Sequence, residues 1–294
     1  MRFAVLGDLH GNPPKVIVRN ADAIIAPGDF CNAGEIRGYA FRAISERAGG
    51  KRNVQWHDLA GKRKAEKLVL DSVRSGRDVL EKLNSLDKPV YIVPGNSDTA
   101  GGKKAGPVLA RSYFEEMIKG LRNIRNCYCR LVDIGDYIVI GYGITDWPEK
   151  PPASFRKTVN RETLKVMGYF YKTVRREQEG LFRRAGKTGK PVIYISHNMP
   201  YKTHLDVVRD KSSPRHGQHV GSVIVREMVE KYQPLVMAGG HMHEHFGMAK
   251  IGRTVCINAG VWPKNVLLEV EGNKIKDLDF ILGEKPSRQS RRGP

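Results

Sequence analysis

Short apolar runs alternate with longer amphipathic stretches along this chain of 294 residues. Five of the runs are strand-like, because each is short, apolar and followed by Gly, Pro or Ser. They are Arg2–Leu6, Ala23–Ala26, Val90–Val93, Val192–Ile195 and Leu235–Ala238, and the helix-like stretches include Gly61–Ser85, Arg156–Arg184 and Val220–Tyr232. This order predicts an α/β fold with a largely parallel sheet, whose ligands bind at the carboxyl ends of its strands.

Further strand-like runs cluster in the second half of the chain. They are Tyr137–Gly143, Thr254–Asn258, Val266–Val270 and Lys274–Leu282. The late cluster predicts a second, antiparallel-rich sheet or half-sheet. We expect one domain over residues 1–283, because the candidate ligands described next run from residue 8 to residue 243. No division of the chain within that span keeps them together.

Side chains of metal-ligand type follow directly after the five strand-like runs. The segments read FAVLGDLH, AIIAPGDF, VYIVPGNSD, VIYISHN and LVMAGGHMH, and the seven candidates are Asp8, His10, Asp29, Asn96, His197, His241 and His243. We expect all of them at one edge of a sheet. Carboxylate, amide and imidazole ligands without thiolates suit Mn, Fe, Co, Ni or Zn better than Ca, and we favour Mn. Because one catalytic ion usually takes three or four protein ligands, the set predicts two divalent ions that share a carboxylate.

No single member of this set identifies a metal site. An Asp such as Asp8 after a strand commonly makes a turn, and a single His such as His197 is commonly a hydrogen-bonded structural residue. His241 and His243 are more specific, because side chains two apart on an extended segment project to the same side. The ordered combination of all seven carries the prediction.

The chain is strongly basic, with a formal net charge of +19. Residues 37–77 carry 11 basic and 4 acidic side chains, and residues 150–190 carry 12 basic and 3 acidic ones. We interpret these stretches as basic helical insertions near residues 37–85 and 150–190 that flank the site. They indicate contact with nucleic acid or simply solvated helix faces, and the sequence favours neither interpretation. Residues 284–294 lack apolar side chains and are predicted to form a basic, disordered tail.

The remaining composition is that of a soluble intracellular protein. The four cysteines lack zinc-site spacing and are too few for a disulfide scaffold, which favours free thiols in a reducing compartment. No run approaches the ~18 apolar residues of a membrane span, and no basic leader precedes the first apolar run. We therefore expect a cytoplasmic protein that does not bind a membrane.

The blocks GDLH, GDFCN, GNSD, ISHNMP and GGHMH, in this order, resemble those of the calcineurin-like metallophosphoesterases. The resemblance covers residues 7–243 and implies a four-layer α/β/β/α sandwich with two ions at the strand ends. It implies that Asp8, His10, Asp29 and His243 hold the first ion and that Asp29, Asn96, His197 and His241 hold the second. A hydroxide bridging the ions would then attack phosphorus.

The third block departs from the pattern common in this family. There the Asn is followed by a His that is thought to protonate the leaving group, whereas this chain has Ser97, which cannot act as that acid near neutral pH. The chain resembles instead a prokaryotic branch with a non-His residue at this position, associated with phosphodiester or nucleotide substrates. Asp98 is the candidate local acid or orienting group, and metal-bound water or a mobile His216 or His219 are the alternatives for the acid. Asn12, Ser97 and His219 are candidate substrate contacts.

These features predict a metal-dependent phosphodiesterase that acts on nucleotide or nucleic-acid substrates. One alternative is a phosphomonoesterase acting on a small phosphate ester. Another is a nucleic-acid-binding module without turnover. The sequence leaves the oligomeric state open.

Overall fold

The computed structural model of the chain describes residues 1–14, 20–51, 54–98, 107–143, 148–150, 161–213 and 215–283. The tail predicted at residues 284–294 lies outside these ranges. The described strands form two sheets. The first has the order β12 (Lys274–Ile281), β11 (Asn265–Glu271), β1 (Arg2–Leu6), β2 (Ala23–Ala26), β3 (Val90–Ile92) and β4 (Ile124–Asn126). The second has the order β5 (Leu131–Asp133), β6 (Ile138–Tyr142), β7 (Val192–Ser196), β8 (Val236–Gly239), β10 (Thr254–Asn258) and β9 (Gly247–Ile251).

Each sheet has a parallel centre and antiparallel additions. In the first sheet β1 to β4 pair in parallel, while β11 and β12 join antiparallel. In the second sheet β6, β7, β8 and β10 pair in parallel, while β5 and β9 are antiparallel edges. The predicted second sheet is present, but it is mainly parallel at its centre, and the late strands do not all belong to it. The late strands are divided between the two sheets, because β11 pairs with β1 of the first sheet and β10 pairs with β8 of the second.

Alternation along the strands builds the core between the sheets. In β1, Phe3 and Val5 face the second sheet, whereas Ala4 and Leu6 face the helices on the outer side. Successive strand side chains point to opposite faces, so a strand that is buried on both faces reads as a continuous apolar run. The runs that predicted the strands have this property.

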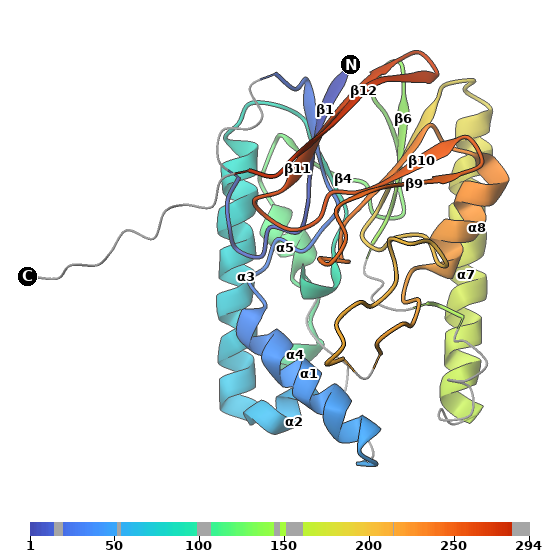
Figure 1. The fold of residues 1–294 in the computed structure, drawn as a ribbon. Coiled ribbons are helices and arrows are strands. Elements are labelled where there is room, and N and C mark those ends of the chain that lie inside the picture. The colour runs from blue at the N-terminus through green and yellow to red at the C-terminus, as the bar shows by residue number, and fades with distance from the viewer. Residues whose placement is uncertain are drawn as a thin grey trace, which may run out of the picture.

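Helices cover the outer face of each sheet and complete four layers (Figure 1). The helices are α1 (Gly34–Ala48), α2 (Trp56–Ala60), α3 (Lys62–Asn84), α4 (Pro107–Ala110), α5 (Phe114–Ile118), α7 (Arg161–Gly186) and α8 (Val223–Tyr232), with a 3₁₀ turn at Asn96–Asp98. α3 packs Val79, Leu80 and Leu83 on the first sheet, and α7 packs Leu181 and Phe182 on the second. The predicted α/β/β/α sandwich is confirmed.

The two basic stretches contain long helices that belong partly to this sandwich. The second halves of α3 and α7 supply the buried contacts on the sheets, and Lys and Arg occupy their solvent faces. α1 and α2 pack instead with the first half of α3 in a small separate cluster that includes Ala65 and Val69. Among the described helices, none combines the length and the apolar character required to cross a membrane.

Candidate metal centre

The seven predicted ligands come together where the carboxyl ends of the two sheets meet. Asp8, His10, Asp29 and Asn96 follow strands of the first sheet, whereas His197, His241 and His243 follow strands of the second. The expectation that one sheet edge would carry all of them was wrong. Their side chains meet because the strands that precede them lie in both halves of the sandwich.

The first group of ligand atoms belongs to Asp8, His10, Asp29 and His243, and these atoms all lie within 4.8 Å of one another. His243 Nε2 lies 2.8 Å from Asp8 Oδ2, and His10 Nε2 lies 3.1 Å from His243 Nε2. Ligand atoms that each lie about 2.0–2.2 Å from one ion are separated from each other by no more than about twice that distance. The group therefore has dimensions that fit a single divalent ion.

The second group surrounds the side-chain oxygen of Asn96. His197 Nε2 lies 2.8 Å and His241 Nδ1 2.9 Å from Asn96 Oδ1. Asp29 connects the two groups, because its Oδ2 lies 3.6 Å from His10 Nε2 while its Oδ1 lies 3.5 Å from His197 Nε2. This position between the groups fits a carboxylate shared by two ions.

Backbone carbonyls orient two of the imidazoles for ligation. His197 Nδ1 lies 3.0 Å from the carbonyl oxygen of Pro27, and His10 Nδ1 lies 3.2 Å from that of Cys31. A carbonyl accepts a hydrogen bond, so each neutral ring carries its proton on Nδ1 and presents the lone pair of Nε2 to the site. Such a partner on the second ring nitrogen is the usual support of a metal-bound His. The donor set therefore fits two transition-metal ions.

The pKa values of Asp8 and His241 also suit metal binding. Burial opposes the charge on Asp8, but the hydrogen bond from His243 and the nearby imidazoles lower the pKa of Asp8 well below its usual range. Burial and the neighbouring His197 lower the pKa of His241 to about 3. At pH 7 the carboxylate is thus ionised and the imidazole is neutral, which are the forms that bind metals.

A comparison with known protein families identifies the family of this chain. The family described as calcineurin-like phosphoesterase matches residues 1–245. The chain is a calcineurin-like phosphoesterase. It is accordingly a metal-dependent hydrolase of phosphoric esters, as the resemblance of its five blocks implied.

Individual relatives of this phosphoesterase are distant. The uncharacterized protein MJ1162 of Methanocaldococcus jannaschii is 26% identical over 214 residues, covering 71% of this chain and 80% of that protein. The crystal structure of phosphopantetheinyl hydrolase (PptH) from Mycobacterium tuberculosis covers 99% of this chain and 98% of its own with a TM-score of 0.52 and 11% identity. At that identity, the similarity establishes the fold alone.

Asp98 of the phosphoesterase is buried, and it binds the backbone of the loops that carry Asp29 and Asn96. Its two oxygens accept hydrogen bonds from the backbone N–H groups of Asp29, Phe30, Cys31 and Gly95, at 2.8–3.0 Å. Burial, together with the charge of Asp29, raises the pKa of Asp98 to about 6. With both oxygens occupied by backbone donors, Asp98 has the contacts of an orienting group, one of the two roles predicted for it.

The ligand loops hold conformations that few sequences tolerate. His10, Asp29 and His241 have positive φ values of 44°, 57° and 64°. A Cβ atom on Gly95 would collide with Asp29, and one on Gly240 would collide with the carboxylate of Asp8. Non-glycine residues in the left-handed region cost free energy and persist where the surroundings enforce them. The glycines beside the ligands provide the necessary close approach.

The three candidate substrate contacts occupy different environments. Ser97 lines the cavity at the metal centre, and its backbone N–H donates to Asp29 Oδ1 over 2.8 Å. The Asn12 side chain donates to the carbonyls of Leu9 and His10, which are the contacts of a turn residue. His219 binds Asp206 through Nδ1 at 2.7 Å, and neither His219 nor His216 is among the described residues lining the cavity.

The cavity contains residues that the sequence analysis missed. It measures about 700 Å³, and its wall includes Ala33 just before α1 and Ile36, Arg37, Ala40, Phe41 and Ile44 of that helix. Arg37 Nη1 lies 2.8 Å from His243 Nδ1, beside the ligands. The spacing of these α1 residues by three and four was a detectable helical pattern, but the sequence alone did not indicate that it faces the site.

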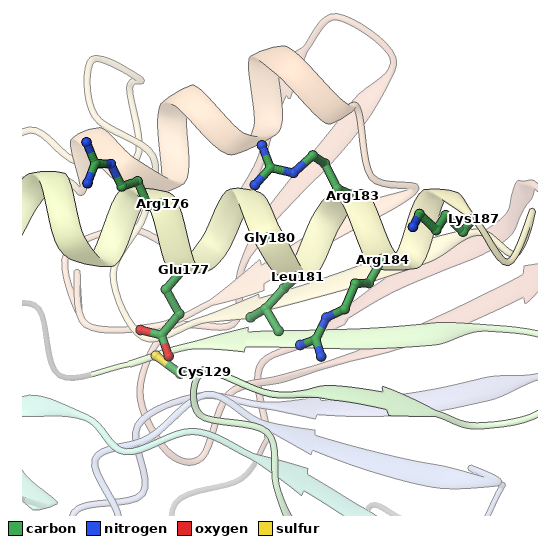
Figure 2. A pocket seen from close by; sticks show the side chains of 8 residues that line it. All are labelled: Cys129, Arg176, Glu177, Gly180, Leu181, Arg183, Arg184 and Lys187. Carbon is green, nitrogen blue, oxygen red and sulfur yellow. The ribbon is translucent and has the colours of Figure 1, made fainter.

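The second basic stretch forms a separate groove on α7, shown in Figure 2. Its wall includes Arg176, Arg183, Arg184 and Lys187 near the end of the helix that leads to the start of β7. In Figure 2 the Arg183 and Arg184 side chains extend to opposite sides of the helix. The groove is separate from the metal centre, because none of its described lining residues also lines the cavity at the ligands.

Replacing Asp29 with Asn removes the charge that both ligand groups face. We expect the Asp29→Asn protein to lose bound Mn after gel filtration and to lose phosphoesterase activity by at least about 100-fold. Elemental analysis and hydrolysis of bis-p-nitrophenyl phosphate measure these effects. Asp136→Asn, at an exposed position between β5 and β6, is the matched control and should change neither. Full metal content in Asp29→Asn would contradict the shared-carboxylate arrangement.

Replacing Asp98 with Asn leaves some of the four backbone donors without an acceptor. Each orphaned donor costs about 1–3 kcal/mol, so we expect the free energy of unfolding to fall by about 2–5 kcal/mol. Mn affinity should also fall by about 10–100-fold, because the Asp29 loop loses its support. Urea denaturation and Mn titration measure the two changes. An Asp98→Asn protein of unchanged stability and metal affinity but lower activity would instead identify Asp98 as the acid.

Proposed function

We propose that this phosphoesterase is a metal-dependent phosphodiesterase whose substrates are small diesters of the nucleotide type. The observation that carries the proposal is the lining of the cavity beside the ligands. Apart from the candidate ligands themselves, the described lining residues include no His, and Ser97 stands next to Asn96. Substrates whose leaving groups need little protonation are the ones such a cavity serves best.

The residues of the chain divide the remaining work. Bound ions lower the pKa of water and neutralise charge that develops on the phosphoryl oxygens. Asp29 lies between the two ligand groups, and the Ser97 N–H and Asp98 fix its side chain and backbone respectively. The neutral imidazole of His241 presents a lone pair without adding charge. This rigid arrangement favours binding of an anion in one orientation.

The position of the basic groove favours a small diester over a nucleic-acid polymer. The described lining of the groove on α7 has no residue in common with that of the cavity at the ligands. A phosphate backbone bound along the groove would therefore lie on a surface separate from the centre. The binding module without turnover is also disfavoured, because all seven ligand-type residues are present and converge.

We expect the Mn-loaded protein to hydrolyse bis-p-nitrophenyl phosphate with a kcat/KM at least about tenfold above that for p-nitrophenyl phosphate, because no imidazole is placed to protonate a poorer leaving group. Chelation of the metal should abolish both activities, and Mn should restore them. Parallel steady-state assays measure the ratio. A preference for the monoester would instead support the phosphomonoesterase alternative, and absence of both activities would exclude the enzyme class.

The variant Ser97→His tests the reason for this preference. An imidazole at this position would restore a general acid, a contribution of about 10²–10⁴ in rate, so the monoester-to-diester ratio should rise by at least about tenfold. Ser97→Ala is the control and should keep the ratio within about twofold of the original, since a serine hydroxyl does no acid work near pH 7. A large loss of diester activity in Ser97→Ala would contradict this account.

A further inference from the structure

One face of α1 is apolar yet covers neither sheet. Ala33, Ile36, Ala40, Phe41 and Ile44 follow the helical spacing of three and four, and all of them line the cavity at the metal centre. Only Ala43 of this helix is buried, and Phe41 is 51% exposed. The apolar stripe of α1 therefore faces the cavity, and only Ile36 of the stripe also packs against the small cluster around Ala65 and Val69.

The neighbouring helices extend this apolar surface around the cavity. Trp56 of α2 and Val69 and Val73 of α3 line it from the other side, and Trp56 is only partly buried. The same cavity reaches His10 and His243. A concave apolar surface continuous with a polar centre is the usual form of a small-molecule site, because apolar ligand groups gain free energy when they leave water.

Arg37 stands at the junction of the metal centre and the apolar wall. Its Nη1 is 2.8 Å from His243 Nδ1, and its guanidinium carbon is 5.3 Å from the centroid of the Phe41 ring. The aromatic face holds the guanidinium next to the ligands. A phosphoryl group at the metal centre would thus meet a cation on the side from which the apolar wall begins.

The size and charge of the cavity exclude a polyanion as its preferred occupant. Its volume of about 700 Å³ lies within the range typical of small-molecule sites. Beyond the candidate ligands and Asp98, the charged residues among its described lining are Arg37, Arg215, Asp210 and Glu244, two of each sign. A nucleic-acid backbone needs a surplus of positive charge along its path. Among the described lining residues, the basic excess of the chain is therefore not concentrated.

We propose that this cavity selects phosphate esters with an apolar or aromatic organic group, which packs against Phe41 and Trp56 while Arg37 binds the phosphoryl oxygens. The proposal deepens and rests on the phosphodiesterase function proposed above. It assigns α1 as the element that determines specificity. It also places the organic group toward α1, α2 and α3, on the side of the first sheet.

A binding experiment tests the apolar wall without requiring turnover. Phenylphosphonate and methylphosphonate carry the same anionic group and differ in the ring, so titration calorimetry of the Mn-loaded protein compares the ring alone. We expect phenylphosphonate to bind at least about tenfold more tightly, as burial of one aromatic ring allows. In Phe41→Ser and in Trp56→Ala, this ratio should fall below about threefold while methylphosphonate binding changes by less than about twofold.

Two further variants separate the wall from the anion contact. Arg37→Gln should weaken both phosphonates by a similar factor of about five or more and keep their ratio, because the cation contacts only the shared group. Phe170→Ser on α7 is the matched control, since Phe170 is 48% exposed and is not among the described residues of the cavity. The ratio of phenylphosphonate to methylphosphonate affinity in Phe170→Ser should equal that of the unmodified protein. Circular dichroism checks that each variant is folded. Phe41→Ser is the variant that perturbs the core least, because Phe41 is exposed.

Three results would overturn the proposal. They are equal affinities for the two phosphonates, a ratio that survives both Phe41→Ser and Trp56→Ala, and displacement of phenylphosphonate by a single-stranded oligonucleotide at physiological salt. An intact binding ratio without hydrolysis of any ester would support the cavity and overturn the phosphodiesterase function. Hydrolysis of diesters with equal phosphonate affinities would do the reverse.

Discussion

The carboxylate of Asp29 is the group on which the rest of the site depends. One of its oxygens faces His10 and the other faces His197, so it joins ligand atoms that the chain brings from two different sheets. Its backbone has a φ of 57°, and its N–H donates to the buried carboxylate of Asp98. Asp8, Asp29 and Asp98 concentrate negative charge in a region of low dielectric constant, where it must be compensated. Imidazoles, backbone N–H groups and divalent ions are the partners that this site provides or accommodates.

The sandwich makes this convergence possible because its two parallel centres end on the same side. β1, β2 and β3 deliver carboxylate and amide groups, and β7 and β8 deliver imidazoles. Phe3, Val5, Ile193 and Ile195 pack between the sheets and fix their separation. A close-packed interior resists changes in that distance, so the ligand geometry is inherited from the core.

The distribution of charge separates the metal centre from the basic surface. The chain carries a net charge of +19, yet the charged residues beyond the ligands and Asp98 in the described cavity lining are balanced in sign. The cations of α7 lie in a groove whose described lining is separate from that of the cavity. A global excess of this kind attracts anions from a distance, whereas selection among them depends on the walls of the cavity.

The sequence by itself determined the strands, the candidate ligands and the family. A short apolar run such as Arg2–Leu6 is enough to predict a strand. Asp8 and His197 are recognisable as candidate ligands by their residue type and by their position after such a run. Family membership followed from the order of the five blocks. These properties depend on residues that are close together in the chain or on their order along it.

Only the tertiary structure decided how distant segments meet. It divided the late strands between two sheets, placed four backbone donors around Asp98, and turned the apolar face of α1 and Arg37 toward the metal centre. The pairing of β11 with β1 joins segments more than 250 residues apart, and local preferences do not encode such a choice. The apolar stripe of α1 can be seen in the sequence. The cavity that it faces cannot, because this cavity forms only when the helices and sheets have packed.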